Sequence, residues 1–298
     1  MRKIKLGTRK SILALAQAKI TANIILQNTG IECELVQIVT SGDKEKTKPL
    51  YEMGGKGLFI KEIEEALVKN EIDIAVHSLK DIPGIIPESL MIGAMLERDD
   101  PRDVLLCKVA TSIAELPQNA KIGTTSPRRI IYLKKLRPDL NICTLRGNWD
   151  TRYKKVIEGE FDGAVLAMAG YNRLHGRFDD KFLHPIAITE MLPAIGQGVI
   201  ALEIRKDDDF MLEICRQINH QLTWDLVSVE RGFLEHLEAG CKTPAAALAQ
   251  KDGNGIKVDF MLATDDWQNI TTHTASCGIK EGYELGKKVA SEMKKRLI

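Results

Sequence analysis

The stretch Asp73–Asp81, DIAVHSLKD, is a short apolar run that ends in a cation and a carboxylate. Its Ile, Ala and Val residues follow a turn signal and predict a buried strand. Residues just beyond the carboxyl end of a strand in an open α/β sheet face a crevice, so we expect Lys80 and Asp81 to lie in one. Pro83 disfavours a helical conformation in the residue before it, which predicts that Asp81 is held on a tight turn. We interpret His77 as a strand-end histidine bonded to the backbone.

The composition limits the class of protein. The chain has 298 residues, of which 44% are hydrophobic, and this is enough for a substantial core and two or three domains. Lys and Arg number 42 against 41 Asp and Glu, so no overall basic field would attract nucleic acid. The N-terminal region lacks the apolar core of a signal peptide, and its first apolar segment is interrupted by polar residues. We expect a cytoplasmic protein that binds neither nucleic acid nor membrane.

The spacing of cysteines and histidines argues against two further classes. The six cysteines are scattered and include no C-x-x-C pair, so we expect reduced thiols rather than a disulfide framework. The six histidines show no H-E-x-x-H or similar ligand spacing, so no metal centre is expected.

The order of segments in the first hundred residues recurs about 115 residues later. The turn Lys121–Arg129 repeats Leu6–Ser11, and Glu160–Val165 repeats Glu71–Val76. The repeat predicts two lobes of similar α/β build, each presenting helix starts and strand ends to a shared cleft. Chance similarity between two α/β segments is the alternative.

The chain is expected to cross between the lobes twice, at Arg98–Asp103 and at Leu192–Gly198, and the second crossing returns it to the first sheet. Two such connections would permit closure of the lobes around a ligand. From about Leu222 onward the pattern predicts a separate small α+β unit. We therefore expect a first lobe, a second lobe and a C-terminal domain at residues 1–97 with 198–217, 98–197 and 218–298, respectively.

Arginines cluster at predicted strand-to-helix turns. Ser126 and Pro127 form a strong helix start, because Ser caps free N–H groups and Pro fits the first helical position. The arginines that follow oppose the helix dipole, so they suit an anionic ligand better than the helix itself. Singly, each arginine is more simply a solvated surface charge. Together they predict a cleft for a polyanion, with these members: Arg128, Arg129, Arg146, Arg152, Arg9 and Arg173.

Other polar residues allow two interpretations each. Cys241 lies in a Gly-Cys-Lys turn beside a cation that favours the thiolate, although an unreactive loop cysteine is the more common outcome for such a turn. Asp81 could equally be a structural cap or a partner for Lys80. The run Gly54–Gly57 is only a weak phosphate-loop signal, because the full spacing of that motif is absent.

A series of motifs follows in order along the chain: Gly7–Ser11, Gly54–Phe59, Ala75–Asp81, Glu97–Asp103, Gly123–Arg129, Leu145–Asn148, Gly196–Gly198 and Gly240–Cys241. Taken together, these motifs resemble the porphobilinogen deaminase (hydroxymethylbilane synthase) family over almost the whole chain. The family has three domains, of which the first two resemble type II periplasmic binding proteins. The resemblance implies a transferase that joins four porphobilinogen molecules head to tail into hydroxymethylbilane, on the route to haem and related tetrapyrroles.

The resemblance also implies roles for individual residues. Cys241 would carry a covalent dipyrromethane cofactor, and Asp81 would be the catalytic carboxylate that stabilises charge on the pyrrole nitrogen and shuttles protons. The residues that would hold cofactor carboxylates are Lys80, Ser126, Arg128 and Arg129. The residues that would serve porphobilinogen or the growing oligopyrrole are Arg9, Ser11, Arg146, Arg152 and Arg173, with Gln197 on the hinge near the site.

The sequence departs from the family pattern at a few positions. The family usually has an apolar residue such as Leu at the position of Pro127, Gly at the position of Ala239, and a smaller residue at the position of Trp149. Trp149 lies between Arg146 and Arg152, so it could alter the fit of the growing chain. We expect a monomer. The main alternative function is a non-catalytic two-lobed binding protein for a small polyanion, which would need neither Cys241 nor a third domain.

Overall fold

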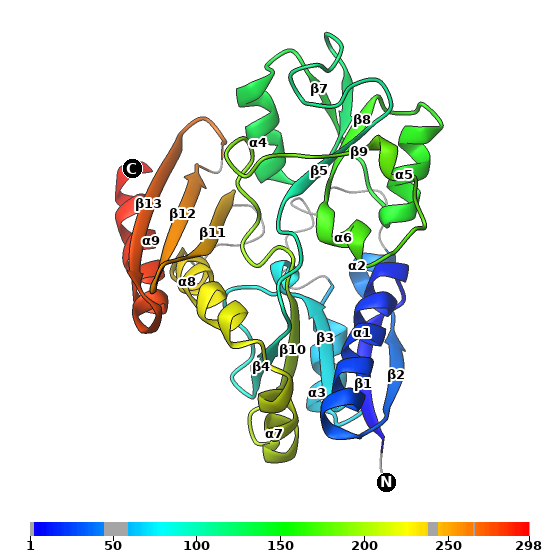
Figure 1. Cartoon of the computed structure of the whole chain (residues 1–298), viewed down its shortest axis with the longest axis vertical. Coiled ribbons are helices and arrows are strands. Elements are labelled where there is room, and N and C mark those ends of the chain that lie inside the picture. Colours follow the sequence, from blue (N-terminus) through cyan, green and yellow to red (C-terminus); the bar gives the residue numbers. More distant parts are fainter. Residues whose placement is uncertain (1–2, 45–58, 238–243, 265, 298) are drawn as a thin grey trace.

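The computed structural model describes residues 3–44, 59–237, 244–264 and 266–297. Within them the chain forms two five-stranded sheets and one three-stranded sheet, each covered by helices (Figure 1). The two large sheets lie at opposite ends of the long axis, and the third unit lies beside them (Figure 1). The predicted class, two α/β lobes and a small C-terminal α+β domain, is confirmed.

The first lobe is built on a sheet with the strand order β2-β1-β3-β10-β4. Strand β1 is parallel to β2 and β3, whereas β10 is antiparallel to β3 and β4. The elements of this lobe are β1 (Ile4–Arg9), α1 (Ile12–Thr29), β2 (Cys33–Ile38), α2 (Ser41–Lys44), α3 (Lys61–Val68), β3 (Ile74–Ser78), β4 (Leu90–Met95), β10 (Ile200–Arg205) and α7 (Asp209–Ile218).

The second lobe repeats this plan with the strand order β7-β6-β8-β5-β9. Strand β6 is parallel to β7 and β8, and β5 is the antiparallel strand in the fourth position. The internal repeat predicted from the sequence is therefore confirmed at the level of strand order. The elements are β5 (Asp103–Cys107), β6 (Lys121–Gly123), α4 (Pro127–Leu136), β7 (Asn141–Cys143), α5 (Trp149–Ile157), β8 (Gly163–Ala167), α6 (Met168–Asn172) and β9 (Leu183–Pro185).

Both antiparallel strands follow a crossing between the lobes. The first crossing leads from β4 in the first sheet to β5 in the second, and the second crossing leads back to β10 in the first. Gly196 and Gly198 in the second crossing have φ values of 70° and 89°, a left-handed conformation that Gly adopts without steric cost. The two lobes are thus joined by a pair of neighbouring connections rather than by one linker.

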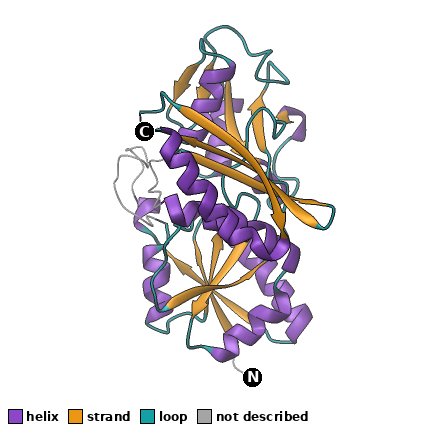
Figure 2. Ribbon diagram, turned by 90° about the vertical axis from the view of Figure 1, so that its left-hand side faces the viewer, coloured by secondary structure: helices purple, strands orange, loops and turns teal. Residues whose placement is uncertain are grey.

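The third unit is an antiparallel sheet with two long helices on one face (Figure 2). Phe233 of α8 packs against Phe260 of β12 with their ring centroids 4.8 Å apart, at the centre of this core. The opposite face of the sheet contributes Met261 to a cluster with Ile131 of the second lobe, which joins the two units. The elements are α8 (Gln221–Leu237), β11 (Ala245–Asp252), β12 (Gly255–Ala263), β13 (Ile270–Gly278) and α9 (Gly282–Leu297).

The stretch Asp73–Asp81 folds largely as predicted. Its apolar residues form β3, whose first four residues are buried, and the chain then turns through a short 3-10 helix, Leu79–Asp81. The prediction for His77 is wrong, because its Nε2 lies 3.1 Å from Oε2 of the buried Glu203 side chain rather than bonding to the backbone. Glu203 lies on the neighbouring β10, a partner 126 residues away that strand patterning alone does not reveal.

Candidate active site

A cavity of about 740 Å³ lies between the two lobes. Its walls come from the ends of β1 and β3 and the start of α1 in the first lobe, and from α5 and α6 in the second. Among the described residues that line it, eight carry a cationic side chain and one, Asp81, carries a carboxylate. The cavity brings together these residues from the sequence prediction: Arg9, Ser11, Lys80, Asp81, Arg129, Arg146, Arg152 and Arg173.

The position of Asp81 follows from the residue two places before it. Leu79 is 1% exposed, and its backbone N–H donates to the carbonyl of Val199 at 3.0 Å. The N–H of Ile82 then donates to the carbonyl of Leu79, which closes the turn that the sequence predicted. The buried leucine anchors this turn to the second crossing. The Asp81 carboxylate therefore faces the cavity from a fixed backbone.

Lys80 is tied to the same crossing. Its Nζ donates to Oε1 of Gln197 at 3.3 Å. Although the side chain reaches solvent in the cleft, the surrounding protein desolvates the ammonium group, and Arg129 adds repulsion. Together these effects lower the pKa of Lys80 to about 8. A carboxylate placed beside this group would favour its charged form.

A buried aspartate that the sequence reasoning missed organises three of the predicted residues. Asp103, at the start of β5, accepts from Nη1 of Arg128 at 2.7 Å and from Nη2 of Arg129 at 2.7 Å. It also accepts from Nε2 of Gln197 at 3.1 Å. Burial alone would raise the pKa of Asp103, but the two guanidinium groups hold it well below its usual value. Asp103 therefore balances one of the two positive charges at the start of α4, and a net positive charge remains there.

Two of the predicted cofactor residues lie at the start of α4, outside the cavity lining. Ser126 caps α4 by accepting from the backbone N–H of Arg129 at 3.5 Å, and Arg128 is 4% exposed. Neither lines the cavity in the part of the chain that the structure describes. Gln197 is 1% exposed and also lies outside the cavity lining, where its Nε2 donates to the carbonyl of Pro101 at 2.7 Å. Cys241 lies outside the described residues.

The start of α1 presents the residues expected from the first turn. Ser11 caps the helix by accepting from the backbone N–H of Ala14 at 3.2 Å. The guanidinium carbon of Arg9 lies 4.0 Å from the centre of the Phe59 ring, a cation–π contact that holds the side chain toward the cavity. Phe59 belongs to the sequence motif Gly54–Phe59, but its stacking on Arg9 could not be derived from spacing.

The start of α5 contributes the second group of arginines. Arg152 donates from Nε to the carbonyl of Gly147 at 2.8 Å, which directs its side chain back over the helix start. Burial lowers the pKa of Arg152 to about 10, and repulsion from Arg129 and Arg146 adds to the effect. Guanidinium groups held this close to one another favour an anionic ligand between them.

Arg173 connects the cavity to the hinge. It is 9% exposed, and its Nη2 donates to the carbonyl of Gly198 in the second crossing. Its Nε lies 3.6 Å from Oδ2 of Asp99 in the first crossing. Burial lowers the pKa of Arg173, while Asp99 opposes this effect. The side chain thus joins α6 to both connections between the lobes as well as lining the cavity.

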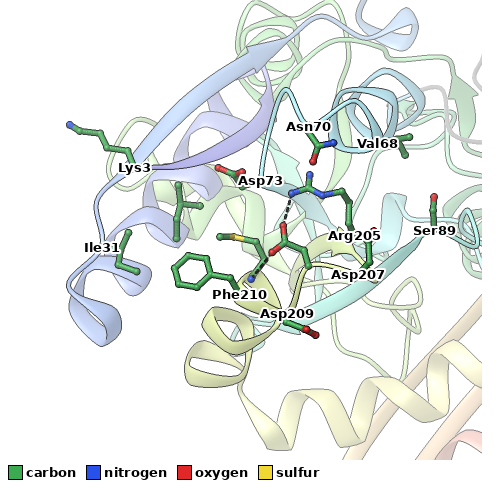
Figure 3. Close-up of a pocket in the computed structure, with 13 residues that line it drawn as sticks. Lys3, Ile31, Val68, Asn70, Asp73, Ser89, Arg205, Asp207, Asp209 and Phe210 are labelled. Carbon is green, nitrogen blue, oxygen red and sulfur yellow. Dashed lines mark hydrogen bonds and ion pairs between the residues drawn. The ribbon is translucent and has the colours of Figure 1, made fainter. Parts of the chain in front are cut away.

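A larger cavity, of about 1160 Å³, lies at the other end of the first sheet (Figure 3). Lys3, Asp73 and Phe210 line it, and Arg205 there is bonded to Asp208 at the start of α7. It shares no described residue with the cavity between the lobes. Its acidic side chains outnumber its cationic ones, so it does not suit a polyanion.

Among the described residues, no three His, Cys, Asp or Glu side chains lie close enough together to hold a metal ion. In the same part of the chain, no helix combines the length and the apolar character needed to cross a bilayer.

The fold and the site together define a two-lobed α/β protein with a polyanion cleft and an attached third domain. The family model "Porphobilinogen deaminase, dipyromethane cofactor binding domain" matches residues 4–213, and "Porphobilinogen deaminase, C-terminal domain" matches residues 224–295. The chain therefore belongs to the porphobilinogen deaminase family, a family of transferases of haem biosynthesis whose cofactor is dipyrromethane.

Curated relatives agree with this assignment over nearly the whole chain. A porphobilinogen deaminase from Rickettsia prowazekii (strain Madrid E) is 53% identical over 292 residues, which cover 97% of each chain. One from Rickettsia canadensis (strain McKiel) is 51% identical over the same length, again with 97% coverage of each. Among solved structures, immunogenic lipoprotein A from Vibrio vulnificus aligns with a TM-score of 0.43 and 12% identity, covering 74% of this chain and 96% of that one.

The lining of the cleft fits a dipyrromethane group. Such a group carries carboxylate side arms, and the cleft presents eight cations against one carboxylate in its described lining. The pKa values of Lys80 and Arg152 are both lowered by burial and by neighbouring cations, so these groups gain from an added negative charge. The donor set is thus complementary to the cofactor of the family.

Proposed function

We propose that this chain joins four porphobilinogen molecules head to tail with loss of ammonia, and then releases linear hydroxymethylbilane by hydrolysis. The observation that carries the proposal is that Asp81 is the one carboxylate among the described residues of a cleft lining that also holds eight cationic side chains. Asp81 is then the catalytic residue and the arginines bind the acidic side arms. A binding protein for polyanions would gain nothing from a carboxylate fixed among those cations.

In this proposal Asp81 acts on the nitrogen of the reacting pyrrole. As ammonia leaves porphobilinogen, positive charge develops on the ring, and a carboxylate held in place stabilises that charge without rearrangement. Asp81 also accepts and returns the proton that each joining step moves. The buried Leu79 and the closed turn keep its position constant from one round to the next.

The arginines orient the substrate and the growing oligopyrrole. Each pyrrole brings an acetate and a propionate, and a guanidinium group binds a carboxylate through two parallel hydrogen bonds. We assign this role to Arg9, Arg146, Arg152 and Arg173, with Ser11 as a hydroxyl donor beside them. Gln197 supports the site through Lys80 and Asp103 rather than from the cavity wall.

The cofactor assignments follow the family pattern. Dipyrromethane, when bound, supplies the pyrrole to which the first substrate is joined. Cys241 is proposed as its covalent attachment point, and Lys80 and Arg129 line the cavity where its carboxylates would be held. Ser126 and Arg128 are assigned to the same group. The capping bond of Ser126 and the contact of Arg128 with Asp103 keep Arg129 in position.

The wider assignments complete the proposal. We propose domains at residues 1–97 with 198–217, 98–197 and 218–298, because the strands of each sheet fall within those bounds. We also propose that the protein acts as a cytoplasmic monomer and binds no nucleic acid. The balanced net charge of +1 supports the last point.

The proposal is tested by intact mass and turnover together. The denatured protein should carry an excess mass of two pyrrole units, and Cys241→Ala should lose it. Asp81→Asn should keep that mass and the native fold but lose nearly all turnover, because Asn cannot accept the proton. Asp100→Asn, which alters a carboxylate paired with Arg102 outside the cavity lining, is the control and should turn over normally. An unmodified parent chain that does not consume porphobilinogen would reject the function, and near-normal turnover by Asp81→Asn would reject the role of the carboxylate.

A further inference from the structure

The first residue of α5, Trp149, lies at the cleft between two of the substrate-binding arginines. It is 7% exposed and belongs to an aromatic cluster in the second lobe. Its ring centroid lies 4.8 Å from that of Phe178 and 6.3 Å from that of Tyr153. The indole ring is therefore held firmly by its neighbours, and its edge has a defined direction.

The indole N–H of Trp149 is buried and has no hydrogen-bond partner among the described residues. An indole nitrogen is a donor only, and a buried donor without an acceptor is unfavourable. Gly170 of α6 faces this N–H, and a Cβ built on it would lie 2.7 Å from Nε1. A side chain at this position would therefore displace the indole, so the close approach of the indole N–H to α6 requires glycine here.

The unpaired donor lies at the contact between the lobes. Trp149 and Gly170 both line the cavity, together with Leu13 of α1 in the first lobe. Cδ2 of Leu13 lies 3.7 Å from the same Cβ position on Gly170. Leu13 also packs on the aromatic cluster from the opposite lobe. Leu13 thus brings an aliphatic side chain from the first lobe close to Gly170 and the aromatic cluster, and separation of the lobes would move it away.

We propose that the Trp149 indole N–H is a further substrate-binding donor, which binds a carboxylate of the growing pyrrole chain once the lobes move apart and Leu13 withdraws. The inference rests on the proposed function, since that reaction brings two carboxylates with every added pyrrole. Arg146 and Arg152 on either side of Trp149 attract those carboxylates to this part of the cleft. The Trp149 N–H has no acceptor while the lobes are in contact and gains one when the oligopyrrole has lengthened. This hydrogen bond therefore favours the widened cleft at the later steps of extension.

The direct test is the indole N–H resonance of Trp149. The chain contains three tryptophans, so a spectrum of the ¹⁵N-labelled holoenzyme shows few indole signals, and the signal missing from Trp149→Phe is that of Trp149. Adding porphobilinogen to form enzyme-bound chains should move this signal downfield, as expected for a new hydrogen bond to a carboxylate. A signal that stays in place while longer chains form would overturn the inference.

Two variants separate hydrogen bonding from packing. Trp149→Phe keeps an aromatic ring in the cluster and removes the donor, so the extension step that uses it should slow by about tenfold or more, with one enzyme-bound intermediate accumulating in native mass spectra. Tyr153→Phe is the matched control. The hydroxyl of Tyr153 accepts from the backbone N–H of Asp179, and Tyr153 does not line the cavity. The populations of enzyme-bound intermediates in Tyr153→Phe should therefore match those of the parent.

The possible outcomes separate failure of this inference from failure of the proposed function. If no pyrrole is added to the parent enzyme at all, the proposed function fails. If chains grow normally on the parent, and Trp149→Phe gives the same populations as the parent, the function stands and the inference fails. A similar disturbance in Trp149→Phe and Tyr153→Phe, with no shift of the indole signal, would assign Trp149 to packing alone and also overturn it.

Discussion

Replacing Asp103 by Asn tests how far one buried carboxylate holds the cleft together. The side chain is fully buried and bonds to Arg128, Arg129 and Gln197. The substitution keeps the size of the side chain and removes its charge, so two buried guanidinium groups lose their counterion. Breaking a buried ion pair from one side costs about 3 to 5 kcal/mol, and this range is the expected loss in the free energy of unfolding at pH 7.

The same carboxylate should make stability depend on pH. Its pKa in the folded chain lies below the value of about 3.9 expected when unfolded, so its stabilisation is complete above the unfolded pKa and is lost as pH falls. Below about pH 3.9 the loss is about 1.4 kcal/mol for each pH unit. The difference in the free energy of unfolding between the parent and Asp103→Asn should therefore be smaller at acidic pH.

The assay is urea unfolding followed by tryptophan emission at pH 7 and at pH 3. Asp100→Asn serves as the control, because its carboxylate is 21% exposed, its partner Arg102 is 43% exposed, and such a pair contributes about 0 to 1 kcal/mol. If Asp103→Asn loses no more stability than Asp100→Asn, Asp103 does not act as the counterion of the two arginines. If the difference in the free energy of unfolding between the parent and Asp103→Asn is the same at pH 7 and pH 3, the lowered pKa of Asp103 does not make stability depend on pH as expected.

Two further predictions concern the cations of the cleft. Arg146→Leu should stall chain extension, because a bidentate carboxylate partner is lost, and native mass spectra should show altered populations of enzyme-bound intermediates. Lys154→Leu, at an exposed cation that pairs with Glu158 outside the cavity lining, is the comparison. Unchanged populations in Arg146→Leu would count against its role. The pKa of Lys80 is about 8, so the charged fraction of this side chain falls from about 90% at pH 7 to about 10% at pH 9. Cofactor uptake is measured on protein prepared without cofactor. Between pH 7 and pH 9, the rate of uptake by the parent should drop about tenfold relative to the rate of Lys80→Arg. A parent-to-variant ratio that does not change with pH would show that the charge of Lys80 is not needed.

Much of the fold could be predicted because both lobes obey the same local rules. The apolar run Ile74–Val76 reads as a strand, and the cap at Ser126 with Pro127 after it reads as a helix start, as observed. The repeat of these signals implied two similar lobes. Strand order is set by pairing between distant segments, so the antiparallel position of β5 and β10 required the structure.

The candidate site could likewise be predicted only where local sequence context decides the position of a residue. Residues at strand ends and in the first turn of a helix, such as Arg9 and Arg152, could be placed in a cleft from their local context. The buried partners of other residues could not, because Asp103 bonds to Arg128 across 25 residues and Glu203 lies beside His77 across 126. Local sequence indicates which groups reach the crevice, whereas the buried counterions depend on which strands become neighbours.

The hinge and the third domain depend on one buried glutamate. Glu230 of α8 is fully buried and accepts from both terminal nitrogens of Arg98 in the first crossing, at 2.8 and 2.9 Å. It also accepts from the backbone N–H of Gly196 in the second crossing and from that of Ala249 in β11. The segment that contains Cys241 joins α8 to β11 in the sequence. α8 is thus bonded to both crossings about which the lobes would move, and β11 is bonded to α8 through the same carboxylate. This arrangement would let the cleft widen while α8 and β11, which flank the Cys241 segment in the sequence, stay bonded to the hinge through Glu230, as a reaction that returns to one carboxylate in every round requires.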